Sequence, residues 1–237
     1  MWSYYGSKSK LVHLYPKPRY PKIIESFAGT ARYGLLYWDH DVTIVDKYEV
    51  VVKIWRWLQK CSPKDILSLP VLKKGDRISR EQFDCDEQFL LMQFMVARAG
   101  SGGRLKVTEF GEKEMGRYRK RISSQLYKIK YWSIVHGSYE CLADMEATWF
   151  IDPPYQHGGE GYAEGNKNLD FHSLAEWCKS RKGQAIVCEN TKADWLPFKP
   201  MRMINGAANT FTTEAIWSNL PTDYDVEQLN LFNLLKE

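Results

Sequence analysis

The sequence Trp149-Phe150-Ile151-Asp152-Pro153-Pro154-Tyr155 joins an apolar run to a carboxylate, two consecutive prolines and an aromatic ring. The apolar run predicts a buried strand. Because proline has no backbone N–H and a fixed φ, this strand cannot continue past Asp152. Ligands bind outside the carboxyl ends of strands in open α/β sheets, so Asp152 is a candidate active-site residue. The alternative is a strand that ends in a Pro-Pro turn with a solvated Asp.

Length and composition are those of a globular protein. With 237 residues, 44% of them hydrophobic, the chain is long enough for one α/β core and a small additional lobe. It contains no run of about 18 apolar residues and no apolar signal-peptide core, so we expect neither a membrane span nor export. Its five cysteines lack a Cys-x-x-Cys pair, which favours a reduced, cytoplasmic compartment and gives no sign of a metal site.

Positive charge is concentrated in one segment. Residues 60–130 hold 16 Lys and Arg against 9 Asp and Glu, a net charge of +7 in a chain whose total is +4. We find no internal repeat, low-complexity tract or flexible linker. The pattern predicts a compact insertion at 60–130 within a single domain formed by 1–59 and 131–237.

The first candidate ligand loop follows a short strand, Lys22 to Phe27. The small residues Ala28-Gly29-Thr30-Ala31 come next and allow a backbone to approach a ligand closely, and a helix is expected to begin at Arg32. Tight turns between a strand and a helix often need glycine for purely structural reasons. The loop alone therefore leaves a nucleotide-like ligand and an ordinary turn open.

An acidic residue ends the next predicted strand. Val42 to Val45 is apolar, Asp46 follows it, and Val50 to Leu58 has the pattern of an amphipathic helix. Asp46 lies 17 residues after Gly29, close to the spacing of about 20 at which an acidic residue binds the ribose hydroxyls in a βαβ nucleoside site. An ordinary helix-capping Asp is the alternative.

Four motifs occur along the chain in a fixed order: Tyr4-Tyr5-Gly6-Ser7-Lys8, Glu25-Ser26-Phe27-Ala28-Gly29-Thr30-Ala31, Asp46, and Asp152-Pro153-Pro154-Tyr155. Their order resembles that of the Dam-like S-adenosylmethionine-dependent DNA adenine-N6 methyltransferases, including the phage and prophage type. The resemblance implies a Rossmann-like, mostly parallel sheet with one antiparallel strand and helices on both faces. It also implies a small, mostly helical target-recognition insertion and a cytoplasmic protein of a bacterial or phage-infected cell.

The resemblance also assigns the site residues. It makes Asp152, Pro153, Pro154 and Tyr155 catalytic. It places S-adenosylmethionine against the residues Tyr4, Tyr5, Gly6, Lys8, Glu25, Phe27, Ala28, Gly29, Thr30, Ala31, Asp46, Lys47, Tyr139 and Asp152. The family usually has a second glycine where this chain has Ala31. We interpret that position as one that needs only a small side chain, rather than a positive φ.

The basic segment is a candidate nucleic-acid surface. The run from Glu87 to Ala99 predicts a helix that is apolar nearly all round and therefore belongs to the core. Cations and aromatic residues alternate farther along, a mixture that suits contacts with phosphates and stacking on bases. The residues expected to contact nucleic acid are Arg98, Arg104, Arg117, Arg119, Lys120, Arg121 and Lys128. A solvated helix face is the alternative.

The expected activity is methyl transfer to the N6 amine of adenine in double-stranded DNA, with the target base flipped out of the helix. The partner is DNA, no metal or membrane takes part, and the protein is a monomer or a weak dimer. Two alternatives stay open: an RNA adenine methyltransferase with the same site, and a nucleic-acid module that binds S-adenosylmethionine without turnover.

The end of the chain completes the expected sheet. Ile134 to His136, Gln184 to Asn190 and Glu214 to Asn219 read as strands, the last of them in an antiparallel pair. Asp170 is expected to cap a helix from Phe171 to about Lys179. The glycine-rich stretch from Gln156 to Tyr162 suits a mobile lid.

Overall fold

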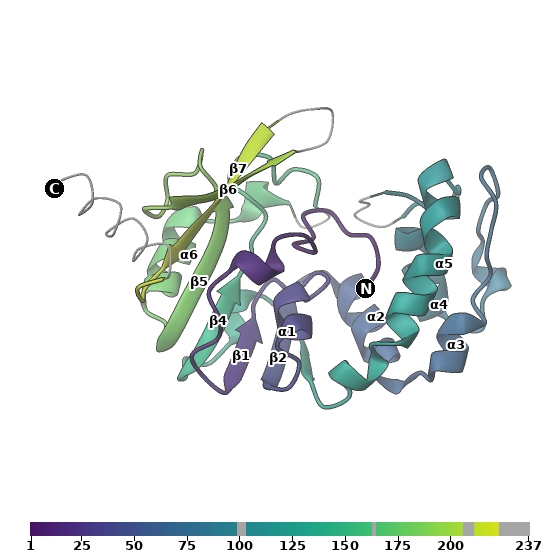
Figure 1. The fold of residues 1–237 in the computed structure, drawn as a ribbon, viewed down its shortest axis with the longest axis horizontal. Helices are drawn as coiled ribbons and strands as arrows, with labels where there is room; N and C mark the ends of the chain where they lie inside the picture. The colour runs from purple at the N-terminus through teal and green to yellow at the C-terminus, as the bar shows by residue number, and fades with distance from the viewer. Residues whose placement is uncertain (99–102, 163–164, 206–210, 223–237) are drawn as a thin grey trace, which may run out of the picture.

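A single mixed sheet organises the computed structural model, which describes residues 1–98, 103–162, 165–205 and 211–222. Its strand order is β3-β2-β1-β4-β5-β7-β6 (Figure 1). The strands are β1 (Lys22–Glu25), β2 (Asp41–Asp46), β3 (Ser133–His136), β4 (Ala147–Ile151), β5 (Gly183–Asn190), β6 (Lys199–Asn205) and β7 (Phe211–Ser218).

Five neighbouring strands are parallel. β1 pairs with β2 on one side and β4 on the other, β2 pairs with β3, and β4 pairs with β5, all in parallel. β7 runs antiparallel to both β5 and β6. The fold is therefore α/β with a mostly parallel sheet, consistent with a Rossmann-like arrangement.

Helices and short 3-10 turns connect the strands. The α-helices are α1 (Arg32–Leu36), α2 (Glu49–Lys60), α3 (Pro63–Leu67), α4 (Asp86–Met95), α5 (Glu109–Ser123) and α6 (Phe171–Lys179). The 3-10 helices are η1 (Val12–Leu14), η2 (Arg80–Gln82), η3 (Leu126–Ile129), η4 (Tyr139–Cys141) and η5 (Asn166–Asn168). None of the helices in the described ranges is long and apolar enough to cross a membrane.

Strand β4 is buried on both faces, and its alternating side chains join two different apolar clusters. Phe150 packs into the cluster that contains α1 and α2, whereas Trp149 and Ile151 pack into the cluster that contains α6. Successive side chains of a strand point to opposite faces, so helices must cover both faces of the sheet. This burial holds the carboxyl end of β4, and with it Asp152, in a fixed place.

Segment 60–130 is mostly helical and contains α3, α4 and α5, which stand beside the sheet next to α2 (Figure 1). Its buried side chains Phe94 and Met115 belong to the same apolar cluster as Trp55 of α2. The prediction that 60–130 is a target-recognition insertion within a single domain stays a prediction. The predicted helix from Glu87 to Ala99 is too long, because α4 ends at Met95 and Val96 is its C-cap.

Most of the other predicted elements are present. The strands predicted near Asp46, His136, Asp152, Asn190 and Ser218 are confirmed as β2, β3, β4, β5 and β7, with small shifts at their ends. Helix α6 begins after Asp170, whose Oδ1 accepts from the backbone N–H groups of His172 and Ser173 at 3.0 and 3.2 Å. Strand β1 stops at Glu25, so Phe27 belongs to the following turn.

Candidate functional site

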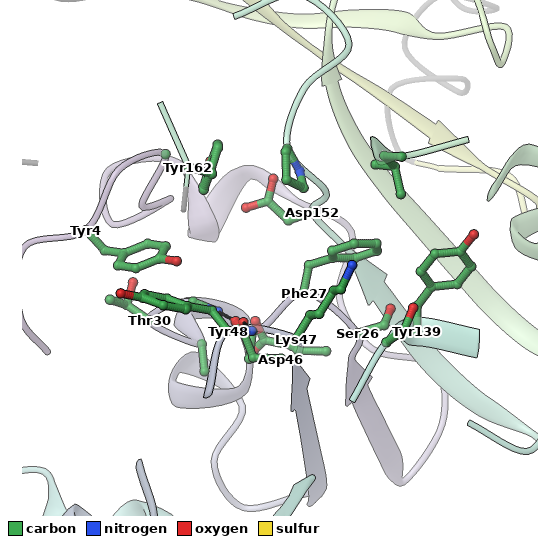
Figure 2. Close-up of a pocket in the computed structure, with 18 of the residues that line it drawn as sticks. Tyr4, Ser26, Phe27, Thr30, Asp46, Lys47, Tyr48, Tyr139, Asp152 and Tyr162 are labelled. Atoms are coloured by element: carbon green, nitrogen blue, oxygen red, sulfur yellow. Dashed lines mark hydrogen bonds between the residues drawn. The ribbon is translucent and has the colours of Figure 1, made fainter. Parts of the chain in front are cut away.

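A cavity of about 210 Å³ lies at the carboxyl ends of β1, β2 and β4 (Figure 2). All fourteen residues that the resemblance assigns to the cofactor line it, although they come from both halves of the chain. Asp152 and Tyr162 face the cavity from one side, and Phe27 and Asp46 from the other (Figure 2). Of the predicted catalytic residues, Asp152 and Pro154 line the cavity, whereas Pro153 and Tyr155 do not.

The turn between β1 and α1 contains two residues with positive φ. Gly29 has φ +45°, and Ala31 has φ +43° and ψ +53°, in the left-handed region. Our interpretation that Ala31 needs only a small side chain is therefore wrong, since the position does require positive φ. The left-handed conformation costs a non-glycine residue about 1 kcal/mol, which the surrounding packing must offset.

Asp46 fastens this turn to the end of β2. Its Oδ2 accepts from the backbone N–H of Gly29 at 2.8 Å, and its Oδ1 accepts from the backbone N–H of Tyr48 at 2.8 Å. The carbonyl of Gly29 in turn accepts from the indole N–H of Trp55 at 2.9 Å. Asp46 therefore shapes the loop as well as lining the cavity.

An aromatic wall and an unsatisfied hydroxyl line the cavity next to the ends of β1 and β3. The rings of Phe27 and Tyr139 stack with centroids 5.5 Å apart. The buried Ser26 Oγ also lines the cavity and has no hydrogen-bond partner among the described residues. Buried polar groups are rarely left unpaired, so Ser26 is a candidate ligand contact that the sequence analysis did not single out. The sequence signal that could have identified Ser26 is its position inside the motif from Glu25 to Ala31.

Glu25 connects the site to helix α1 through a buried hydrogen bond. Its side chain is buried, and its Oε1 accepts from the backbone N–H of Gly34 in α1 at 2.5 Å. Burial raises its pKa to about 8, although the Gly34 N–H works in the opposite direction. At neutral pH the group is therefore largely protonated, which suits an anchor for α1 better than a counter-ion for a ligand.

A buried ion pair joins the first and last motifs. The Nζ of Lys8 donates to Asp152 Oδ1 at 2.7 Å, and the two side chains are only 6% and 17% exposed. Burial disfavours the ammonium of Lys8, but Asp152 and Glu214 outweigh it and raise the pKa of Lys8 well above its ordinary value. Burial also raises the pKa of Asp152 to about 6, against the opposing effect of Lys8. The cation therefore fixes Asp152 through one oxygen and leaves Oδ2 for another donor.

Glu214 of β7 is a third buried charge that the sequence analysis did not assign to the site. Its Oε1 accepts from the hydroxyl of Tyr15 at 2.6 Å and from the hydroxyl of Tyr155. The same oxygen lies 3.7 Å from Lys8 Nζ. Burial, followed by the charges of Glu214 and Asp152, raises the pKa of Tyr155 far above its ordinary value, so the phenol stays protonated and donates.

Tyr162 closes the cavity over the N-terminal turn. A Cβ at position 6 would lie 1.7 Å from the Tyr162 hydroxyl, and Gly6 has φ +69°, so both space and backbone conformation require glycine there. The hydroxyl of Tyr5 donates to the carbonyl of Gly158 at 3.1 Å, and the rings of Tyr5 and Tyr162 meet edge to face. The stretch from Gln156 to Tyr162 is thereby joined to the first motif. Its predicted mobility stays a prediction.

The predicted nucleic-acid residues lie on several elements, and those of α5 point in different directions. On α5, the exposed Arg117 pairs with Glu114 at 2.7 Å and lies on the same side as Lys120, whereas Arg119 Nε donates to the carbonyl of Ile66 in α3 at 3.4 Å. Because residues three apart share a helix face and residues one or two apart do not, Arg119 points away from the other two. The guanidinium of Arg121 lies over the Tyr118 ring, with its central carbon 5.1 Å from the centroid.

The remaining predicted cations lie on other elements. Arg98 and Arg104 flank residues 99–102, which lie outside the described ranges. Arg98 lies over the Phe110 ring at 5.6 Å, and Lys128 of η3 lies over the Trp38 ring at 5.8 Å. Arg104 lines a second hollow, together with Lys74, Arg77 and Lys106.

Within the described ranges, no group of three or more His, Cys, Asp and Glu side chains is arranged to hold a metal ion.

Comparison with known proteins gives no assignment: no protein-family model matches the chain, and no curated protein matches it. The chemistry of the site therefore has to be inferred from its own residues.

Proposed function

We propose that the protein transfers a methyl group from S-adenosylmethionine to the N6 amine of adenine in DNA. One observation carries the proposal: the fourteen residues assigned to the cofactor by sequence line a single cavity, and Asp152 lies at its edge. The sheet supports it further, since five parallel strands and a reversed β7 agree with the Rossmann-like methyltransferase sheet that the resemblance implies.

The residues around the cavity fit an adenosyl cofactor. Phe27 and Tyr139 offer an aromatic wall for the adenine, and the unpartnered Ser26 Oγ offers a polar contact. Asp46 suits the ribose hydroxyls, because carboxylate oxygens accept from both. Arg32 also lines the cavity, and although burial lowers its pKa to about 10 it stays charged at neutral pH, which suits the carboxylate of the amino-acid part.

Bound S-adenosylmethionine supplies an activated methyl group as a sulfonium. The chain's own task is to prepare the amine, whose lone pair is delocalised into the adenine ring. Asp152 Oδ2 and the Pro153 carbonyl oxygen can each accept a hydrogen bond from one N–H of the amine. These two hydrogen bonds favour a tetrahedral nitrogen with a localised lone pair. Tyr155 would stack on the extruded base, which offsets the few kcal/mol that extrusion costs.

A methyl-transfer assay with labelled S-adenosylmethionine, read by mass spectrometry of the nucleosides, tests the proposal. Duplex DNA, single-stranded DNA and RNA of matched sequence are offered in parallel. N6-methyladenine in DNA is the expected product. Methylation confined to RNA would replace the proposed substrate, methylcytosine would replace the target base, and binding of the cofactor without any transfer would leave a binding module.

The first prediction concerns Asp46. Replacing Asp46 with alanine should weaken S-adenosylmethionine binding by about 1 to 3 kcal/mol, because hydrogen-bonded polar groups lose a partner. Isothermal titration calorimetry measures this change. Asp41→Ala is the matched control, since Asp41 begins the same strand and pairs with Lys22 at 2.7 Å on the exposed side. Equal affinity in the two variants would remove Asp46 from the cofactor site.

The second prediction concerns the cations of α5. Replacing Arg117 and Lys120 together with alanine should lower the log-log salt slope of DNA binding by about 2, because two fewer counterions are released. The matched control replaces Lys179 and Lys182 together with alanine. This double variant removes the same charge at and just after the end of α6. Fluorescence anisotropy at several salt concentrations gives the slopes. If both double variants have the same slope, Arg117 and Lys120 belong to a solvated face.

A further inference from the structure

One oxygen of Glu214 lies at the centre of the groups that support the Asp152-Pro153-Pro154-Tyr155 motif. Glu214 Oε1 accepts from the Tyr155 hydroxyl and lies 3.7 Å from Lys8 Nζ, which itself holds Asp152 at 2.7 Å. The ends of the motif are thus connected to the same carboxylate, Tyr155 directly and Asp152 through Lys8. Lys8 Nζ also lies 4.6 Å from the centroid of the Tyr155 ring.

The sheet register explains how a residue so late in the chain reaches this place. Ile151, the last residue of β4, pairs with Val187 of β5, and Glu214 pairs with Asn190, three residues farther along β5. Glu214 therefore lies level with the segment that follows β4. A strand running in the opposite direction delivers the carboxylate to the edge where the parallel strands end.

The three ionic groups leave a net negative charge. Lys8 contributes one positive charge, and Asp152 and Glu214 contribute two negative charges, with all three side chains nearly or mostly buried. Of these, Lys8 and Asp152 line the cavity itself. Charges act strongly at short range in a poorly solvated site, so this group favours a cation over a neutral molecule of the same shape. S-adenosylmethionine is cationic at sulfur, and its demethylated product S-adenosylhomocysteine is neutral there.

We infer that Glu214 is a positioning residue that holds Tyr155 and the Lys8–Asp152 pair in place and supplies the negative charge by which the site selects a sulfonium over a thioether. The inference rests on the proposed function and deepens it. A purely structural Glu214 would only satisfy two tyrosine hydroxyls. The two roles separate because only the first predicts a change in ligand preference when the charge is removed and the shape is kept.

Calorimetry of Glu214→Gln with S-adenosylmethionine and with S-adenosylhomocysteine tests the inference. The amide still accepts from both tyrosines, but one negative charge is lost. We expect the ratio of the two affinities to shift about tenfold toward the thioether, the order of effect of removing one mostly buried charge near the site at intermediate screening. Tyr15→Phe is the matched control, because it removes a hydrogen bond to the same oxygen without changing charge. Its affinity ratio should stay within about twofold of the wild-type value.

Glu214→Asp provides a second test if the glutamine variant does not fold. It keeps the charge but withdraws the carboxylate from Tyr155, so the affinity ratio should be kept while turnover falls. An unchanged ratio in Glu214→Gln, or unchanged turnover in Glu214→Asp, would overturn the inference. A wild-type protein that binds both ligands equally would overturn it too. If wild type prefers the sulfonium and methylates no nucleic acid, the proposed function fails while the charge selection stands.

Discussion

Replacing Asp152 with alanine should lower the turnover of methyl transfer about a hundredfold or more, by analogy with the removal of one preorganised transition-state partner. The carboxylate is expected to accept from the target amine most strongly as the nitrogen becomes tetrahedral, so the loss falls on kcat. DNA binding should change much less. Steady-state kinetics under saturating cofactor, together with DNA affinity by anisotropy, separate the two quantities.

The pH dependence of the wild-type protein gives a second view of the same group. Burial raises the pKa of Asp152 to about 6, with Lys8 opposing it. The ionised carboxylate is the form that accepts hydrogen bonds, so turnover should fall as the pH drops through about 6. The Asp152→Asn variant should lose this acidic limb.

Asp194→Ala is the matched control for Asp152. Asp194 is exposed, accepts from the Gln156 side chain at 3.0 Å just beyond the motif, and does not line the cavity. Its turnover should stay close to that of the wild-type protein. An Asp152→Ala protein that methylates adenine at nearly the wild-type rate would contradict the proposed mechanism.

Replacing Lys8 with methionine should lower the free energy of unfolding by about 3 to 5 kcal/mol, because it leaves the buried Asp152 and Glu214 without their cation. Methionine keeps the length and apolar stem of the side chain, so the lost charge accounts for most of the effect. For a chain of this size the melting temperature should fall by about 6 °C or more. Chemical denaturation measures the free energy directly.

Two further variants isolate the role of charge. Lys10→Met removes an exposed lysine two residues farther along and should leave stability nearly unchanged. Adding Asp152→Asn to Lys8→Met should recover part of the lost stability, because it removes one of the unpaired carboxylates. If Lys8→Met is as stable as Lys10→Met, the buried network does not contribute to folding in the way described.

The parts of the site that lie in short motifs could be predicted from the sequence. Asp46 and Asp152 each follow an apolar run, so local patterns placed each of them at the end of a strand, and the resemblance assigned both to one cofactor. The cap on α6 could be predicted for a similar reason, because Asp170 accepts hydrogen bonds from residues two and three positions farther along its own helix.

Features that depend on distant partners could not be predicted. Glu214 joins the site through the register of an antiparallel strand, which no local pattern specifies. Arg119 belongs to a run of cations, but its direction depends on how α5 packs against α3. The φ of Ala31 is imposed by the tight turn between β1 and α1, and a small side chain alone does not reveal it.

The origin of Glu214 in β7 also links the site to one edge of the sheet. β7 has only β6 between it and the sheet edge. Partial opening of this hairpin would carry Glu214 away from Tyr155 and Lys8 while the five parallel strands stay paired, and such local openings cost less than global unfolding. Hydrogen exchange at β7 therefore reports the lifetime of the assembled site, separately from the lifetime of the fold.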